Sequence, residues 1–174
     1  SVESQAATKS GKTMHDARAV ANYVLSRAWE LGYEVTQIDI QKICYFLHGH
    51  HLVEHGAPLI KTEFEAWEYG PVQRVLYGAF KKFEKEPITE IAKAFDPVRR
   101  DDKELEQITE NSAIDTIEKH LQKYLDVPSF GLVDMTHAQG TPWSSTMLEA
   151  ESKVNVGMRI SDRVIKERFE GLTS

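Results

Sequence analysis

The residues best suited to chemistry are histidines, which gather in one stretch of the chain. His51 and His55 are four residues apart, a spacing that places two imidazoles on one helix face, as a metal pair requires. The HExxH pattern of zinc hydrolases is absent, and the sequence fixes no third ligand. The favoured interpretation is two half-buried histidines that complete an apolar face. A metal-dependent hydrolase using this histidine cluster is the alternative.

His137 and Cys44 are candidates for acid–base and covalent chemistry. His137 follows Thr136 and could act as a general base, but no nucleophile or orienting carboxylate stands at a recognisable spacing. A structural or partner-contacting hydrogen bond is therefore favoured. Cys44 lies in an apolar stretch, where a thiol is ordinarily inert, and as the single cysteine it excludes an intramolecular disulfide. We predict a protein that is not an enzyme and holds no metal or cofactor.

The histidine-rich stretch belongs to a helix predicted over residues 40–55. Apolar residues occur on nearly every side of it, and only Lys42 and Gly49 leave a narrow polar or small strip, so the helix should lie in the middle of a domain. Gly49 predicts close approach by another backbone. Thr36, with Asp39 three residues later, resembles a capping box at the start of this helix.

Other segments with helical periodicity surround this one, and together they predict a mainly α fold, a single compact helical domain over residues 14–174. Residues 1–13 are small and polar, which predicts a disordered N-terminal extension. Further helices are predicted over residues 16–31, 71–83, 101–125, 129–137 and 160–169.

A short β or extended element is predicted over residues 62–69, where Thr, Phe, Trp and Tyr replace the helical pattern. Gly70 then permits a turn, and Pro71 suits the first turn of the next helix. Trp67 and Tyr69 are two residues apart, so an extended chain would place them on the same side.

Several aromatic residues are either core residues or anchors for a protein partner. Trp and Tyr are enriched at the energetic centres of protein interfaces. The loop between Thr136 and Trp143 contains a glycine and should hold His137 and Trp143 beside each other at a surface. Tyr69 and Trp143 are the best candidates to line a groove. The predicted partner-binding residues are Trp67, Tyr69, Pro71, His137 and Trp143.

Composition narrows the classes of partner. The chain has 174 residues, of which 41% are hydrophobic, enough for one core without disulfides or metals. The net charge of -6 argues against broad binding to nucleic acid or anionic membrane, and the lack of a basic recognition helix disfavours a DNA-binding autoregulator. No apolar run approaches the roughly 18 to 20 residues of a membrane span, and no signal peptide is visible. These features predict a cytoplasmic protein.

Three blocks, KICYFLHGHHLVEHGAPLIKTEFEAWEYGPV, DMTHAQGTPW and ISDRVIKERF, resemble the SocA-like antitoxin family, or Panacea domain. The most specific parts are Gly56-x-Pro58-Leu59, the turn that begins at Tyr69-Gly70, and Thr136-His137 followed by Pro142-Trp143. The resemblance spans about residues 17–169. It implies a mainly helical, phage-associated or bacterial antitoxin that binds and neutralises a cognate protein toxin. It also implies, in some cases, an adaptor that hands the toxin to a Clp-type protease.

Overall fold

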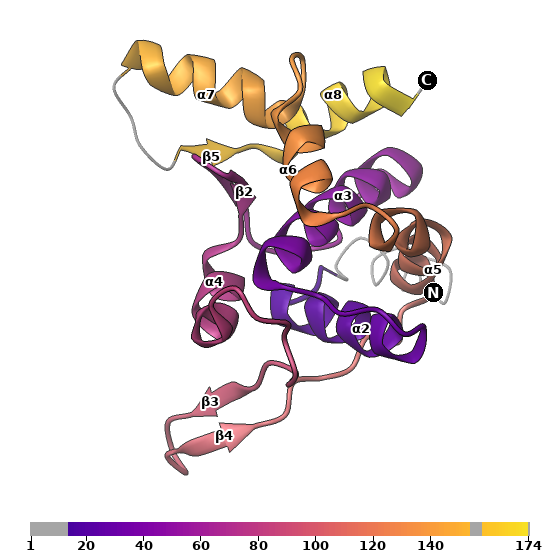
Figure 1. Ribbon diagram of the computed structural model, residues 1–174, viewed down its shortest axis with the longest axis vertical. Helices are drawn as coiled ribbons and strands as arrows, with labels where there is room; N and C mark the ends of the chain where they lie inside the picture. The colour runs from indigo at the N-terminus through magenta and orange to yellow at the C-terminus, as the bar shows by residue number, and fades with distance from the viewer. Residues whose placement is uncertain (1–13, 154–157, 174) are drawn as a thin grey trace, which may run out of the picture.

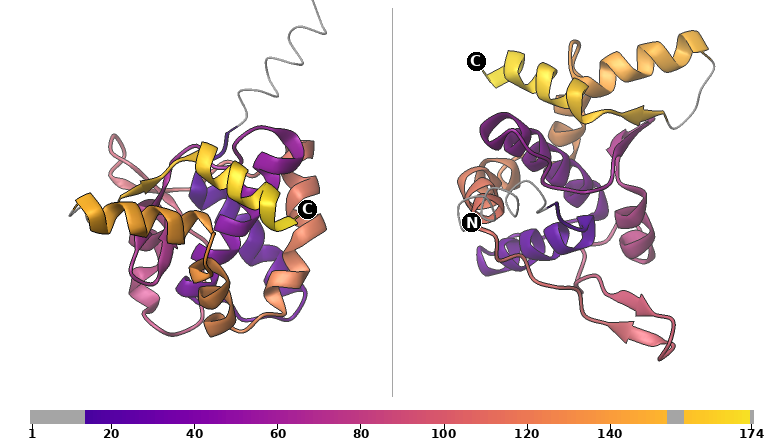
Figure 2. Two further views of the ribbon diagram at one scale, coloured as in Figure 1. Left: turned by 90° about the horizontal axis from the view of Figure 1, so that it is seen from above. Right: turned by 180° about the vertical axis from the view of Figure 1, so that it is seen from behind.

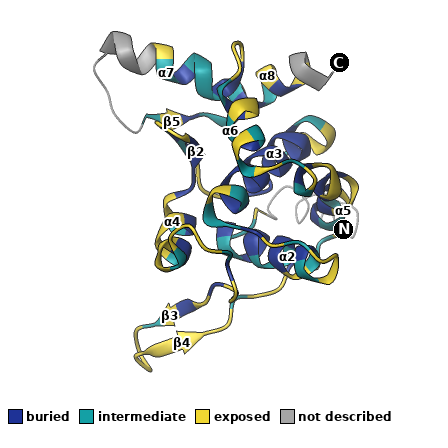
Figure 3. Ribbon diagram, viewed as in Figure 1, coloured by how far each residue is buried: buried dark blue, intermediate teal, exposed yellow. Residues whose placement is uncertain are grey.

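Helix α3 (Gln37–His55) lies at the centre of the fold, with other helices on several sides of it (Figure 1). The structure is a computed structural model that describes residues 14–153 and 158–173. The extension predicted for residues 1–13 lies outside the described residues. Every residue from Ile40 to Leu52 is buried, which agrees with the apolar residues found on nearly every side of this segment (Figure 3).

Both ends of α3 are fixed by local hydrogen bonds. The predicted capping box is present, because the Thr36 hydroxyl accepts from the Asp39 backbone N–H at 3.3 Å and the Asp39 carboxylate accepts from the Thr36 N–H at 3.0 Å. Gly56 ends the helix in the left-handed region, at a φ of 67°.

Gly49 is needed for a different reason from the one predicted. A Cβ at this position would lie 2.2 Å from Cε2 of Phe169, a residue of the C-terminal helix α8 (Asp162–Thr173). An aromatic side chain, and not another backbone, therefore occupies the space beside Gly49. This contact packs α8 against the central helix.

The fold is mainly helical, as predicted, and the helices surround α3 unequally. Helix α5 packs along α3 on one side, and α7 and α8 lie together across one end of the molecule (Figure 2). No helix within the described ranges 14–153 and 158–173 is both long and apolar enough to cross a membrane. The remaining helices are α2 (Ala17–Glu30), α4 (Arg74–Phe80), the 3₁₀ helix η1 (Lys81–Phe83), α5 (Asn111–Leu125), α6 (Ser129–His137) and α7 (Pro142–Lys153).

The predicted extended element is a strand in a small antiparallel sheet. Strand β1 (Phe64–Trp67) lies between β2 (Gly70–Val72) and β5 (Arg159–Ile160). Trp67 pairs with Gly70, so Glu68 and Tyr69 form the turn of a hairpin. Two predictions are therefore wrong. Pro71 belongs to β2 and not to a helix, and Tyr69 lies in the turn, where strand alternation does not apply.

The long helix predicted over residues 101–125 is wrong in its first part. Strand β4 (Asp101–Lys103) pairs with β3 (Ala94–Asp96), and the helix begins only at Asn111. The carboxylate of Asp96 accepts hydrogen bonds from two backbone N–H groups of the intervening turn, at 2.9 and 3.2 Å. This turn reverses the chain, so strand pairing prevails over the helix propensity of the residues after it.

Candidate functional site

The β1–β2 hairpin packs against the segment that joins α6 to α7, and this region contains all five predicted partner-binding residues. Pro71, however, is buried, so it supports the hairpin from inside and is not available to a partner. The Trp143 indole N–H donates to the carbonyl oxygen of Trp67 at 2.7 Å. The His137 ring stacks on Trp143 with 3.9 Å between ring centroids and 11° between planes. The sequence-based expectation that the loop would hold these two rings together agrees with this geometry.

A buried lysine supports the same hairpin from inside. Lys42 lies on α3, is 2% exposed, and donates from Nζ to the carbonyl oxygen of Pro71 at 3.1 Å. Gly70 has a φ of 113°, and a Cβ there would lie 2.8 Å from both Lys42 Cε and Thr136 Oγ1. Glycine therefore allows the hairpin to pack directly against α3 and α6.

Two basic groups beneath the hairpin have lowered pKa values. Burial lowers the pKa of Lys42 to about 8, because the charged ammonium loses its hydration. Burial also lowers the pKa of His137, and the nearby Lys42 charge lowers it further. Within the described residues, His137 Nε2 is buried without a hydrogen-bond partner. A neutral imidazole stacked on an indole is suited to packing beneath this surface and not to an ion pair with a partner.

The outward side of the hairpin is aromatic, and its one arginine, Arg74, pairs with Glu65 of β1 at 2.6 Å. Tyr69 is 68% exposed and Tyr77 is 45% exposed. The Arg74 guanidinium lies 5.3 Å from the centroid of the half-buried Trp67 ring, which is 5.5 Å from the ring of Tyr77. We call the side chains of Trp67, Tyr69, Arg74, Tyr77 and Trp143 the hairpin surface. Trp, Tyr and Arg are the residues most enriched at the energetic centres of protein interfaces.

The two histidines of the His51–His55 pair lie in different environments. The two rings are 4.7 Å apart and tilted by 33°, and His51 Nδ1 donates to the carbonyl oxygen of Ala57 at 2.6 Å. His51 is buried, and His55 lies in the exposed last turn of α3. Neither histidine is half-buried as expected, because His51 lies inside with structural contacts and His55 is exposed.

A different cluster offers three possible metal ligands. Within the described part of the chain, only His50, Glu54 and His120 bring three such donor atoms together, all within 4.8 Å of one another. The imidazoles stack face to face, 3.7 Å apart and 5° from parallel, and His120 Nε2 is hydrogen bonded to Glu54 at 2.8 Å. Because nitrogen lone pairs lie in the ring plane, parallel rings do not aim at one ion. Metal binding would require one imidazole to turn.

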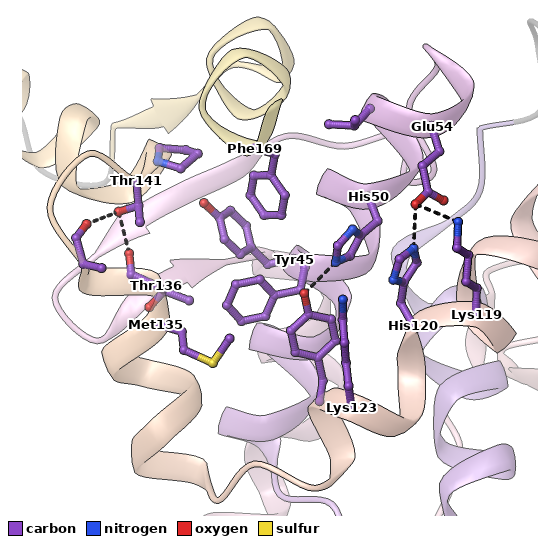
Figure 4. Close-up of a pocket in the computed structure, with 15 residues that line it drawn as sticks. Tyr45, His50, Glu54, Lys119, His120, Lys123, Met135, Thr136, Thr141 and Phe169 are labelled. Atoms are coloured by element: carbon purple, nitrogen blue, oxygen red, sulfur yellow. Dashed lines mark hydrogen bonds and ion pairs between the residues drawn. The ribbon is translucent and has the colours of Figure 1, made fainter. Parts of the chain in front are cut away.

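The cluster opens into a cavity of about 630 Å³ between α3, α5, α6 and α8 (Figure 4). Burial lowers the pKa of His50 to about 4, and the charges of His120 and Lys123 lower it further. His50 Nε2 is hydrogen bonded to the Tyr124 hydroxyl at 2.6 Å. The cavity therefore has an apolar interior and a neutral histidine in its wall.

Sequence reasoning missed two parts of this arrangement. The sequence shows Lys42 as part of a narrow polar strip, and one lysine within an apolar helix is itself a signal for a specific acceptor. The i, i+4 spacing of His50 and Glu54, which places both side chains on one helix face, is also visible in the sequence. The third member, His120, comes from another helix, and no local pattern connects it to the first two.

Comparisons with known proteins show the family of this chain. Residues 40–144 match the model of the family described as antitoxin SocA-like, Panacea domain, and the chain belongs to this family. One relative, Antitoxin SocA of Caulobacter vibrioides (strain NA1000 / CB15N), is 34% identical over 164 residues, covering 88% of this chain and 82% of the relative. No solved structure matches the chain. Family membership supports an antitoxin role and suggests a protein that is not an enzyme.

Proposed function

We propose that this protein is an antitoxin that neutralises a cognate protein toxin by direct binding through the hairpin surface. The observation that carries this proposal is Tyr69, a large aromatic side chain that is 68% exposed at the turn of a rigidly supported hairpin. A side chain of this size gains binding free energy when a partner covers it. The family supplies the class of partner, a protein toxin.

The contacts behind the hairpin explain why this surface would bind well. Trp143 and Lys42 each donate a hydrogen bond to a hairpin carbonyl, at 2.7 and 3.1 Å. Strand pairing with β2 and β5 holds both edges of β1. The hairpin therefore needs little ordering on binding, and less of the interaction free energy is lost as conformational entropy.

Binding would have a further consequence for the toxin. As an adaptor, the protein would hand the bound toxin to a Clp-type unfoldase or protease, in the cytoplasm of a bacterial or phage-infected cell. The net charge of -6 would speed encounter with a basic toxin and disfavours nucleic acid as a direct partner.

Co-expression with the product of the neighbouring open reading frame tests the proposal. We expect growth inhibition by that product alone, rescue by this protein, and co-purification of the two chains. Rescue without a stable complex would indicate transient delivery, and the toxin would then show a shorter half-life only in cells that contain the protease. Absence of both toxicity and association would overturn the proposal for this pair.

Matched variants assign binding to the surface. Tyr69→Ala should weaken the complex by about 2 kcal/mol, the cost typical of a hot-spot residue. Phe95→Ala is the control, because Phe95 is 61% exposed on the other hairpin, at the opposite end of the molecule (Figure 1). Equal weakening by the two changes would place the binding site elsewhere.

A further inference from the structure

The cavity between α3, α5, α6 and α8 has the size and lining of a small-molecule site. Its volume of about 630 Å³ is within the usual range for ligand pockets. Phe46 and Tyr124 stack in its wall, 4.7 Å apart and 4° from parallel, and Phe169 and Met135 add further apolar surface (Figure 4). The chain therefore offers a ready-made environment for a hydrocarbon or aromatic body.

One mouth of the cavity carries positive charge. Lys119, Lys123 and Glu54 are among the lining residues, so two ammonium groups and one carboxylate border the cavity there. Glu54 pairs with Lys119 at 3.4 Å and with His120 at 2.8 Å. Among the described residues no carboxylate pairs with Lys123, whose Nζ lies 5.2 Å from the Tyr124 ring centroid. In a chain of net charge -6, this excess of positive charge favours an anionic group at the mouth.

We propose that this cavity binds a small apolar carboxylic acid, with its carboxylate at Lys123 and its body against Phe46, Tyr124 and Phe169. This site is separate from the hairpin surface and does not depend on the proposed toxin.

The two sites nevertheless share one loop. Thr136, Ala138 and Pro142 line the cavity, while His137 and Trp143, which alternate with them along the chain, support the hairpin. A ligand in the cavity would therefore contact the same loop from its other side.

Titration calorimetry on the purified protein alone tests the proposal with matched probes. Octanoate should bind, and octanamide, which lacks the charge, should bind about fivefold more weakly. Lys123→Gln should remove this preference, because an exposed ion pair contributes up to about 1 kcal/mol, or a factor of about five. Lys103→Gln is the control, since Lys103 is exposed on β4, away from the cavity.

Absence of octanoate binding would overturn the proposal. So would equal binding of octanoate and octanamide, or equal effects of the Lys123 and Lys103 changes. None of these outcomes depends on toxin neutralisation, so the two proposals fail separately.

Discussion

Substituting Gly49 tests the packing that joins α8 to the central helix. In Gly49→Ala the new Cβ would lie 2.2 to 2.5 Å from three atoms of the Phe169 ring, closer than any real contact allows. Phe169 is 4% exposed and packs near Tyr45 and Phe46, with ring centroids 5.6 and 6.2 Å away. The ring therefore cannot move without disturbing its neighbours.

Two opposing effects determine the size of the change. Alanine is favoured over glycine inside a helix by about 1 kcal/mol. Overpacking a well-filled core costs about 1–3 kcal/mol. We expect Gly49→Ala to lower the free energy of unfolding by up to about 2 kcal/mol, measured by urea denaturation. Gly78→Ala is the control, because Gly78 lies in α4 with open space around it, and this variant should gain about 0.5–1 kcal/mol.

A double-mutant cycle separates packing from helix propensity. Phe169→Ala alone should cost about 3–5 kcal/mol. In that background the clash is gone, so Gly49→Ala should stabilise the protein by up to about 1 kcal/mol, and its effect reverses sign. If Gly49→Ala has the same effect in both backgrounds, or stabilises the wild-type protein, Phe169 does not occupy the space beside Gly49 and the reasoning fails.

Three further changes probe the local structure. Thr36→Ala removes the capping box of α3 and should cost about 1 kcal/mol in urea denaturation, and an unchanged midpoint would contradict this role. Gly70→Ala forces a side chain into a φ of 113° and against Lys42, so it should cost about 1–3 kcal/mol, and tolerance of alanine would refute the tight packing there. Lys42 has a folded-state pKa of about 8, below its usual 10.5. Between these two pH values the unfolded chain binds more protons than the folded chain. The free energy of unfolding should therefore rise by roughly 3 kcal/mol as the pH increases from 8 to 10.5. Lys42→Met should lack this rise when compared with the wild type at each pH, and parallel curves would exclude the buried ammonium as its source.

The central helix and its ends were predictable because the determining signals are local. Thr36 and Asp39 define the capping box, and apolar residues on nearly every side of α3 predict burial on all faces. The helix predicted over residues 101–125 failed because the β3–β4 hairpin depends on strand pairing and on the turn at Asp96, which a helical pattern does not reveal.

The candidate site was predictable only in part. Its aromatic residues and the loop that holds His137 beside Trp143 could be read from residue type and spacing. Lys42 reaches Pro71 across 29 residues of sequence, and His120 reaches Glu54 across 66. Such contacts arise from the packing of distant segments, so the sequence of one segment cannot specify them.

Site-specific photocrosslinking tests the central claim most directly. A benzoylphenylalanine placed at Tyr69 should crosslink to the co-expressed toxin in cells, whereas the same group placed at Phe95 on the opposite hairpin should not. Crosslinking from position 95 and not from position 69 would contradict binding through the hairpin surface. Selective crosslinking from position 69, together with rescue of growth, is the result that we predict.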